Sequence, residues 1–460
     1  MVFETETLNL LAKALEELSS GFAFLPNPEG RVASRTAMGE VMTEVASRLH
    51  DNYPYFHPLY AGQMLKPPHP IARAAYALAT WINPNNHALD GGRASSAMER
   101  EAVAEIAGMF GWKEHLGHLC GGGTMANLEA LWVAGQLHPG KTIAASEQAH
   151  YTHHRISSVL RLPFAQVPSD NRGRLDATAL EKILEAGHVG CVVATVGTTG
   201  TGSLDPLPNL LALRERYGFR LHVDAAYGGY YTLAANLDDD ARAVYDLIGQ
   251  ADSIVVDPHK HGLQPYGCGC VLFRDPAVGV LYQHESPYTY FTSKDLHLGE
   301  ISLECSRPGA SAVALWATQR LLPLVRGGEF AAMLENSREA ALALYGRLCA
   351  DARWRAPFAP ELDIVVWAPR SETARRTSEL SQRIFDAAAR RNLHLALIRL
   401  PVRFFVSDDA SDWTGQQAGR QGEHDAVLCL RSVLMKPEHL AWVERIAEIL
   451  EECVAESASL

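Results

Sequence analysis

The sequence has little of the positive charge that nucleic-acid binding requires. Its 460 residues include 53 acidic side chains but only 41 Lys and Arg, so the net charge is −12. Because a phosphate backbone is bound by a basic surface, we do not expect nucleic acid as a partner. Long hydrophobic runs are also missing, and none approaches the roughly 20 residues that cross a bilayer. We therefore expect no membrane-spanning segment and no membrane partner.

Cysteine is scarce and scattered. The chain has eight cysteines and no C-x-x-C pair, so we expect neither a disulfide framework nor a zinc or redox motif. The first 20 residues carry acids and an amphipathic period instead of a basic stretch followed by an apolar one, a pattern that is not typical of a signal peptide. These features predict a reduced, cytoplasmic protein.

Internal repeats and low-complexity segments are absent too, and short apolar runs alternate with helical periods instead. The expected strands are 141–146, 189–196, 219–224, 252–257 and 268–273. Two of the helices between them carry end signals, an N-cap at Asp176 and a closing Gly218. Continuous apolar strands that alternate with helices predict an α/β fold with a mainly parallel central sheet covered by helices.

The pattern changes in the last third of the chain. A long helical region at 310–350 precedes isolated strands at 362–369, 394–402 and 427–435 and a closing helix at 437–454. The segment before residue 70 is rich in proline and aromatics and indicates an arm that packs on another surface. We predict an N-terminal arm (1–70), a large α/β domain (71–328) and a smaller C-terminal α+β domain (329–460).

Ligands in open α/β sheets bind beyond the carboxyl ends of the strands, so polar residues there are candidate site residues. A glycine cluster at 121–123, followed by Thr124, opens a helix whose free N–H groups can cradle a phosphate. A simple turn is the alternative for such a cluster taken alone. The cluster matches neither the Walker pattern nor the dinucleotide pattern.

Three histidines follow the expected strand 141–146. His150, His153 and His154 invite a metal site, but nothing nearby in the sequence completes a ligand set, and we predict no metal. His150, at the strand exit, is better suited to ring stacking or to acid–base chemistry. We interpret His153 and His154 as ordinary helix residues.

Further strand ends carry Thr199, Asp224 and Lys260. The hydroxyl of Thr199 can orient a neighbour or bind an anion, unless the segment is merely a turn. Asp224 is followed by small residues and fits either a flat ligand lying against the backbone or a helix N-cap. Lys260 stands between two histidines after a buried strand, and a solvated turn lysine is the alternative reading.

In combination, these strand ends supply the parts of a pyridoxal phosphate site. Lys260 offers an amine that bonds the aldehyde of the cofactor as a Schiff base. Asp224 keeps the pyridine nitrogen protonated by ion pairing, which makes the ring an electron sink. The glycine cluster anchors the phosphate, Ala226 lets the ring lie close, and His150 covers the opposite face.

Five stretches of the chain resemble a known family. They are "HLCGGGTMANLEAL", "SEQAHYTHHR", "VGTTGTGSLDPL", "HVDAAYGG" and "DSIVVDPHK". In this order they resemble the group II pyridoxal-phosphate-dependent decarboxylases of fold type I. That family includes aromatic-amino-acid, tyrosine and glutamate decarboxylases and, more distantly, sphingosine-phosphate lyase. The resemblance runs from about residue 50 to about residue 330.

The resemblance implies a role for individual residues. It makes Lys260 the Schiff-base lysine, Asp224 the partner of the pyridine nitrogen and Ala226 the small residue under the ring. It makes His150 the histidine that stacks on the cofactor, with a further role in positioning the substrate carboxylate or in protonation. The other matches are the phosphate-binding positions Gly123, Thr124 and His259, and Thr199, which supports the ring and its aspartate.

The family's proton donor is a tyrosine on a loop after the lysine, and the loop corresponds to 284–309 here. Tyr288 and Tyr290 are both candidates, with Tyr288 favoured, and the alternative is that both pack at a dimer interface. Arg307 is expected to hold a substrate carboxylate or to support the site. The segment 83–99 and Met125 depart from the family's pattern, so the resemblance leaves the substrate open.

The sequence therefore predicts an enzyme that removes the α-carboxylate of an L-amino acid to give an amine and CO₂. Aromatic substrates such as tyrosine, DOPA or tryptophan are favoured by the resemblance, which also implies a homodimer. Acidic or diamino substrates, a carbon–carbon lyase, an aldehyde-forming variant that uses oxygen, and a catalytically inactive relative are the alternatives.

Overall fold

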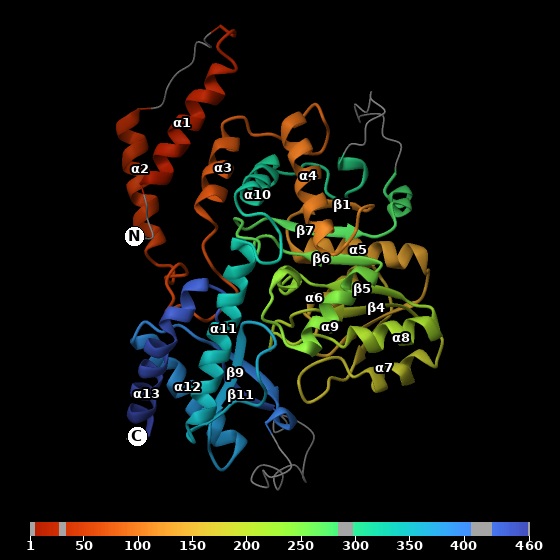
Figure 1. Ribbon diagram of the computed structural model, residues 1–460, viewed down its shortest axis with the longest axis vertical. Helices are drawn as coiled ribbons and strands as arrows, with labels where there is room; N and C mark the ends of the chain where they lie inside the picture. The colour runs from red at the N-terminus through yellow and green to blue at the C-terminus, as the bar shows by residue number, and fades with distance from the viewer. Residues whose placement is uncertain (1–4, 27–33, 284–297, 406–425, 459–460) are drawn as a thin grey trace.

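A computed structural model of the chain describes residues 5–26, 34–283, 298–405 and 426–458. It contains a seven-stranded sheet in the order β1-β7-β6-β5-β4-β2-β3 and a four-stranded sheet in the order β10-β11-β9-β8 (Figure 1). The predicted fold class is confirmed: the larger sheet is mixed but mainly parallel, and the smaller one lies in the C-terminal part of the chain.

The central sheet has two strands more than the sequence predicts. Its strands are β1 (Leu116–Cys120), β2 (Thr142–Ser146), β3 (Phe164–Val167), β4 (Val189–Thr195), β5 (Arg220–Asp224), β6 (Ser253–Val256) and β7 (Gly269–Phe273). The two missed strands, β1 and β3, form the edges of the sheet. β3 is short and only partly buried, and β1 carries the polar His118 in its middle, so neither shows a continuous apolar run.

β7 is the exception to the parallel arrangement, because it runs antiparallel to both β1 and β6. Its first residue, Gly269, pairs with Cys120 at the carboxyl end of β1, and Cys270 pairs with Val256 at the carboxyl end of β6. The carboxyl end of β1, the start of β7 and the carboxyl end of β6 therefore lie together on the same side of the sheet, where the parallel strands end. This side carries the glycine cluster and Lys260.

Helices cover both faces of the central sheet. Along β4, Val192 packs in one hydrophobic cluster and the next residue, Val193, packs in another. Successive side chains of a strand point to opposite faces, so both faces of β4 are buried and the strand reads as a continuous apolar run. The covering helices are α4 (Arg93–Met109), α5 (Gly123–Leu137), α6 (Thr152–Val159), α7 (Ala177–Leu184), α8 (Leu207–Tyr217), α9 (Asp239–Leu247) and α10 (Gly309–Leu321).

The two predicted helix-end signals are confirmed. Asp176 caps α7 by accepting hydrogen bonds from the N–H groups of Thr178 and Ala179. Gly218 ends α8 with a φ of 71°, a left-handed conformation that glycine adopts without steric cost. Short 3₁₀ helices occupy Gly229–Leu233, Ile248–Gln250, Pro276–Leu281, Leu298–Glu300, Val402–Phe404 and Pro437–Trp442.

The smaller sheet is antiparallel throughout its described pairings. Its strands are β8 (Trp354–Arg355), β9 (Ile364–Pro369), β10 (Ala396–Pro401) and β11 (Ala426–Val433), and its helices are α11 (Glu329–Ala350), α12 (Ala374–Arg390) and α13 (Val443–Ala458). The three strands expected after residue 350 are all present, and only the two-residue β8 was missed. The domain limits at residues 70 and 328 stay predictions.

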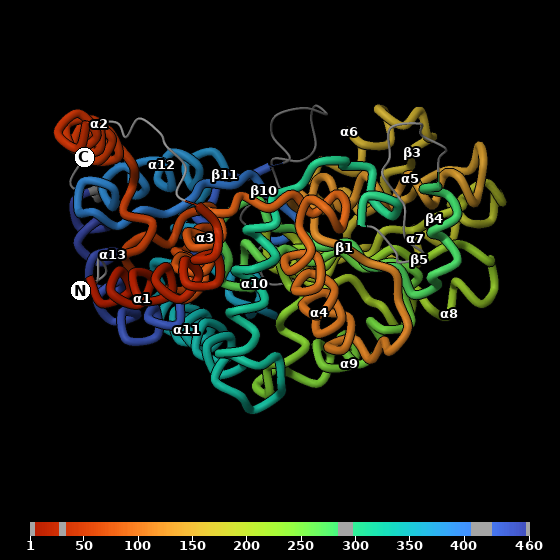
Figure 2. The backbone as a smooth tube through the Cα atoms, turned by 90° about the horizontal axis from the view of Figure 1, so that it is seen from above, coloured from red at the N-terminus to blue at the C-terminus, as the bar shows by residue number. Residues whose placement is uncertain are grey.

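The N-terminal segment forms α1 (Glu6–Ser20), α2 (Arg35–Leu49) and α3 (Pro70–Thr80). Neither α1 nor α2 has a buried residue, and both views place them at one end of the molecule, away from the central sheet (Figures 1 and 2). Between α2 and α3, Tyr60 forms a parallel bridge with His394, just before β10. This part of the segment is therefore joined to the smaller sheet.

None of the helices that the structure describes has both the length and the apolar character required to cross a membrane.

Candidate active site

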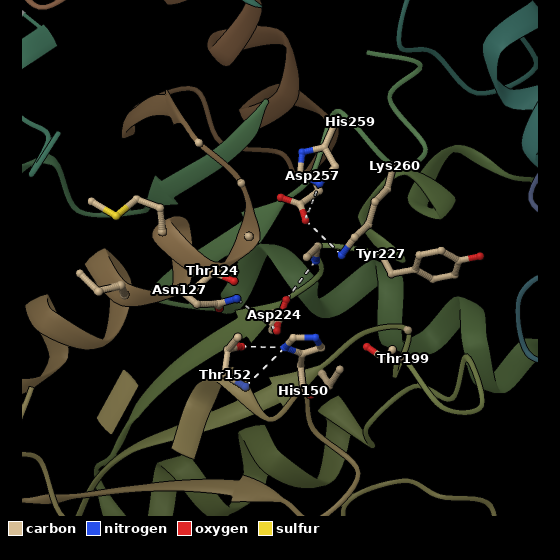
Figure 3. A pocket seen from close by; sticks show the side chains of 18 residues that line it. Thr124, Asn127, His150, Thr152, Thr199, Asp224, Tyr227, Asp257, His259 and Lys260 are labelled. Carbon is tan, nitrogen blue, oxygen red and sulfur yellow. Dashed lines mark hydrogen bonds and ion pairs between the residues drawn. The ribbon is translucent and has the colours of Figure 1, made fainter. Parts of the chain in front are cut away.

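One cavity of about 530 Å³ lies beyond the carboxyl ends of the central strands (Figure 3). All the residues that the sequence predicted to bind the cofactor line this cavity, namely Gly123, Thr124, His150, Thr199, Asp224, Ala226, His259 and Lys260. Residues that were not predicted also line it, among them Asn127, Leu128, Thr152, Tyr227 and Asp257. The structure thus brings the predicted residues together, and their individual roles are taken up below as proposals.

The glycine cluster forms a bare backbone wall of the cavity. Gly122 has a φ of 145°, a conformation that residues with a side chain rarely adopt. A Cβ at Gly269 would lie 2.5 Å from the Cα of Gly122, so β7 and the cluster approach too closely for any side chain. α5 begins at Gly123 and has no side-chain cap. The N–H groups and the positive dipole end of α5 are thus available to a phosphate.

His259 provides a second feature that fits an anionic group. Its ring packs against Tyr266, with 4.7 Å between the ring centroids. The ring also lies next to Gly122, since a Cβ placed on that glycine would be 3.1 Å from Cε1 of His259. The Nδ1 atom is buried and has no hydrogen-bond partner among the described residues. A buried polar atom without a partner is costly. A phosphate oxygen held between the glycine cluster and His259 would satisfy it.

Lys260 points to a carboxylate inside the cavity. Its Nζ lies 3.0 Å from Oδ2 of Asp257, whose side chain is 2% exposed, as Figure 3 shows. The sequence marked Asp257 only as the end of a strand. The structure shows that it holds the lysine, and that Lys260 is not the solvated turn residue that was the alternative reading.

Asp224 is the most extensively bound carboxylate of the cavity. It accepts hydrogen bonds from Nε2 of His153 at 2.8 Å, from Nδ2 of Asn127 at 3.3 Å and from the N–H of Ala226 at 3.1 Å. Burial alone would raise the pKa of this carboxyl, but the hydrogen bond and charge of His153, with the charge of Lys260, hold the pKa well below its usual range. Asp224 is therefore ionised.

The interpretation of His153 as an ordinary helix residue is wrong. The side chain is 1% exposed, and its Nε2 forms a hydrogen bond with Oδ2 of Asp224. His154, interpreted in the same way, is exposed and packs its ring against Phe164. Along the described parts of the chain, no cluster of His, Cys, Asp and Glu has an arrangement suited to a metal ion.

Thr152 orients His150, a contact that no sequence motif indicates. Nδ1 of His150 lies 2.8 Å from Oγ1 of Thr152 and 3.4 Å from its N–H. Because a backbone N–H can only donate, we assign Nδ1 as an acceptor and place the proton of the neutral ring on Nε2. Burial lowers the pKa of His150, with Lys260 adding to the effect and Asp224 opposing it, so the ring is neutral near pH 7.

Two residues, Arg431 and Asp363, connect the surroundings of the cavity to the smaller sheet. Arg431 of β11 donates from Nη1 to the carbonyl oxygen of Thr199 at 3.0 Å. Tyr227 donates its hydroxyl to Oδ1 of Asp363, which precedes β9, at 2.6 Å, and Nε2 of His261 lies 3.3 Å from Oδ2 of the same carboxylate. Asp363 thus accepts a hydrogen bond from the residue after Ala226 and lies beside the residue after Lys260.

Arg307 lies behind the glycine cluster rather than along the cavity. It is 5% exposed and pairs with Glu99 at 2.7 Å. Glu99 also accepts from the N–H of Leu119 at 2.9 Å and from Asn86 at 2.6 Å. Of the two roles expected for Arg307, only support of the site fits this geometry. Tyr288 and Tyr290 lie outside the described residues.

The cavity therefore combines a glycine-lined helix start without a side-chain cap, a buried Nδ1 of His259 without a hydrogen-bond partner, an ionised Asp224 and the amine of Lys260. These residues fit pyridoxal phosphate, whose phosphate, pyridine nitrogen and aldehyde call for such groups. Fold and site together define the protein as a pyridoxal-phosphate-dependent enzyme.

Comparison with known proteins agrees. The profile of the family described as "Pyridoxal-dependent decarboxylase conserved domain" matches residues 132–368, more than half of the chain. The chain belongs to this family of carboxy-lyases, and its cofactor is pyridoxal 5′-phosphate.

Two curated relatives act on different substrates. An L-tyrosine decarboxylase of Enterococcus faecium is 28% identical over 418 residues, which cover 69% of this chain and 68% of that protein. An aspartate 1-decarboxylase of Aliivibrio fischeri is 33% identical over 274 residues, which cover 50% of this chain and 49% of that protein. The chain thus spans about two thirds and about half of the lengths of these relatives.

The fold is also that of a solved structure, the crystal structure of Oryza sativa TDC with PLP and tryptamine. The TM-score is 0.76 at 17% sequence identity, and the match covers 97% of this chain and 96% of that one. The resemblance stated from the motifs is thereby confirmed.

Proposed function

We propose that this enzyme removes the α-carboxylate of an aromatic L-amino acid, giving the aromatic amine and CO₂. The observation that carries the proposal is the wall of the cavity. Met125 and Leu128 line it with apolar surface, and among the described lining residues there is no arginine. Both lining carboxylates are already paired, Asp224 with His153 and Asp257 with Lys260.

This lining disfavours the alternative substrates. Among the described lining residues, an acidic side chain would find no cation except Lys260, which is already paired with Asp257. A buried unpaired charge costs several kcal/mol. A diamino substrate would need a carboxylate that is not committed to His153 or Lys260. An aromatic ring needs only apolar surface and room, which Met125 and Leu128 help to provide.

The residues that line the cavity would hold the cofactor. Lys260 would bond its aldehyde carbon, and Asp224 would bind its pyridine nitrogen. Gly123, Thr124 and His259 would bind its phosphate. Ala226 would leave space for the ring, His150 would cover it, and Thr199 would support the ring and Asp224.

When bound, pyridoxal phosphate supplies an electron sink for the electrons that remain after CO₂ departs. The protein's task is then to orient the carboxylate for departure and to return one proton to the same carbon. His150 is suited to both tasks, since we assign a proton to its Nε2 and the ring lines the cavity. Tyr288, the tyrosine favoured from the sequence, is the second proton donor that we propose, and Lys260 releases the amine.

An amino-acid panel tests this function directly. The cofactor-loaded enzyme is incubated with L-tyrosine, L-DOPA, L-tryptophan, L-aspartate, L-glutamate and L-2,4-diaminobutyrate, and CO₂ and products are measured by mass spectrometry. We expect amine and CO₂ in equal amounts from an aromatic substrate. Its kcat/KM should exceed that of L-aspartate by about 100-fold or more, because about 2.7 kcal/mol of unpaired-charge cost corresponds to that ratio.

Other outcomes of the panel would contradict the proposal in distinct ways. Faster turnover of L-aspartate or of the diamino acid would support decarboxylation but would contradict the aromatic substrate class. An aldehyde formed with peroxide would indicate the oxygen-using variant, and cleavage without CO₂ would indicate a carbon–carbon lyase. Cofactor binding without any turnover would identify an inactive relative.

We further propose that the enzyme is a homodimer in which α1 and α2 pack on the second copy. Both helices present large apolar side chains to solvent, including Met42 at 64% and Phe24, just after α1, at 80% exposure. On α2, Met38, Val41, Met42, Val45 and Leu49 recur at helical spacing and form a single stripe. A second copy of this chain would cover the stripe.

Light scattering coupled to size-exclusion chromatography tests the dimer. The double variant Met42→Glu, Val45→Glu is expected to shift the full-length protein from dimer to monomer, because two charges would be buried without partners. Ser47→Glu, on the opposite side of α2, is the matched control and should stay dimeric. A wild-type monomer, or a double variant that remains dimeric, would disprove this interface.

A further inference from the structure

His153 lies between two cavities. Its ring contacts Asp224, which lines the cofactor cavity, and it lines a second cavity of about 520 Å³ together with Glu147, His150 and Gln166. One ring nitrogen, Nε2, is bound to Asp224, whereas Nδ1 is buried and has no hydrogen-bond partner among the described residues. The bond to Asp224 is thus the one hydrogen bond of this ring among the described residues.

The other histidine of this region cannot replace it. Asn127 donates its amide to Asp224, so its oxygen is the acceptor that faces Nε2 of His222 at 2.8 Å. Nε2 of His222 must then donate, and its Nδ1 accepts from Ser253, 2.9 Å away. Burial, followed by the charge of His153, lowers the pKa of His222 to about 3. His222 is neutral and reaches Asp224 only through Asn127.

The hydrogen bond from His153 influences whether the proton between Asp224 and a bound pyridine nitrogen lies on the carboxylate or on the nitrogen. A hydrogen bond to the charged form of a carboxyl stabilises that form. While His153 donates to Asp224, the carboxylate is therefore a weaker base, and a proton between the carboxylate and the pyridine nitrogen stays on the nitrogen. Without the bond, the carboxylate would draw this proton towards itself.

We propose that His153 is a positioning residue which, by donating Nε2–H to Asp224, keeps the proton of this pair on the cofactor's pyridine nitrogen. The inference rests on the cofactor arrangement proposed above. It assigns to His153 a function that neither its place on α6 nor the family resemblance indicates. Its effect is transmitted through Asp224. His153 is not one of the described residues that line the cofactor cavity.

The test uses protein loaded with pyridoxal phosphate labelled with ¹⁵N in the ring. The ¹⁵N chemical shift reports directly whether the nitrogen carries the proton. We expect the protonated shift in the wild type and a clear displacement towards the unprotonated shift in His153→Leu. His153→Gln, whose amide can still donate, should restore most of the wild-type shift. The Kd of pyridoxal phosphate should rise by about 10-fold in His153→Leu, as expected for a lost hydrogen bond to a charged group.

His154→Leu is the matched control, because it makes the same change at the neighbouring, exposed position and should leave shift and Kd unchanged. If His153→Leu does not fold, as judged by thermal melting, His153→Phe retains a ring without the donor and is expected to give the same displacement. A folded, loaded variant with the wild-type ¹⁵N shift would overturn the inference. A wild type that fails to bind the cofactor would instead overturn the proposed site, so the two failures are distinguishable.

Discussion

Replacing Lys260 with alanine is expected to abolish covalent attachment of the cofactor and to reduce turnover by at least about 1,000-fold. Lys260 supplies the only lysine amine among the described residues that line the cavity. Its loss removes both the covalent bond and a proton-transferring group, and a positioned acid or base alone contributes roughly 10²–10⁴-fold. Borohydride reduction followed by intact mass measurement should show the added mass of the cofactor in the wild type and none in the variant.

The control for this experiment is Lys182→Ala, which removes an exposed lysine from α7. It should retain the added mass and wild-type turnover. If Lys260→Ala kept the added mass, another amine would be the attachment point, and the assignment of Lys260 would be wrong. Peptide mapping after reduction would then identify that amine.

Replacing Asp224 with asparagine is expected to weaken cofactor binding and to lower turnover, by about 200-fold to 5,000-fold in total. Asparagine retains the size of the side chain but carries no charge to pair with a protonated pyridine nitrogen. Breaking a buried charge pair costs about 3–5 kcal/mol, and each 1.36 kcal/mol is tenfold in affinity or rate. Fluorescence titration with pyridoxal phosphate measures the Kd, and CO₂ release measures the turnover.

Asp176→Asn is the matched control for the Asp224 variant. Asp176 caps α7, and asparagine caps helices about as well as aspartate, so stability, Kd and turnover should all be retained. A wild-type Kd and rate in Asp224→Asn would show that the negative charge of Asp224 is not used by the cofactor.

The sequence was sufficient to locate the site because a sheet imposes its own geometry. Thr199, Asp224 and Lys260 each follow an apolar run, and the carboxyl ends of parallel strands meet at one edge. Once the runs were identified as neighbouring strands, the convergence of these side chains followed. The glycine cluster follows β1, which was missed, and it was recognised instead as the start of a helix.

Pairings across the site were not predictable in the same way. His153 binds Asp224, and Asp257 binds Lys260. The residues around His153 and Asp257 in the sequence do not indicate these partners. A signal for His153 did exist: Thr152, His153 and Ile156 fall at the spacing of one helix face, and that face of α6 is buried. A buried histidine without a partner is expensive, so the face implied a polar partner without identifying it.

The contacts of Asp363 have a mechanical consequence. This carboxylate, at the start of β9, binds Tyr227 and His261 together, and each of those residues is the chain neighbour of a cofactor-facing one. Because one carboxylate contacts both loops, loss of its side chain would loosen the loop of Ala226 and the loop of Lys260 together.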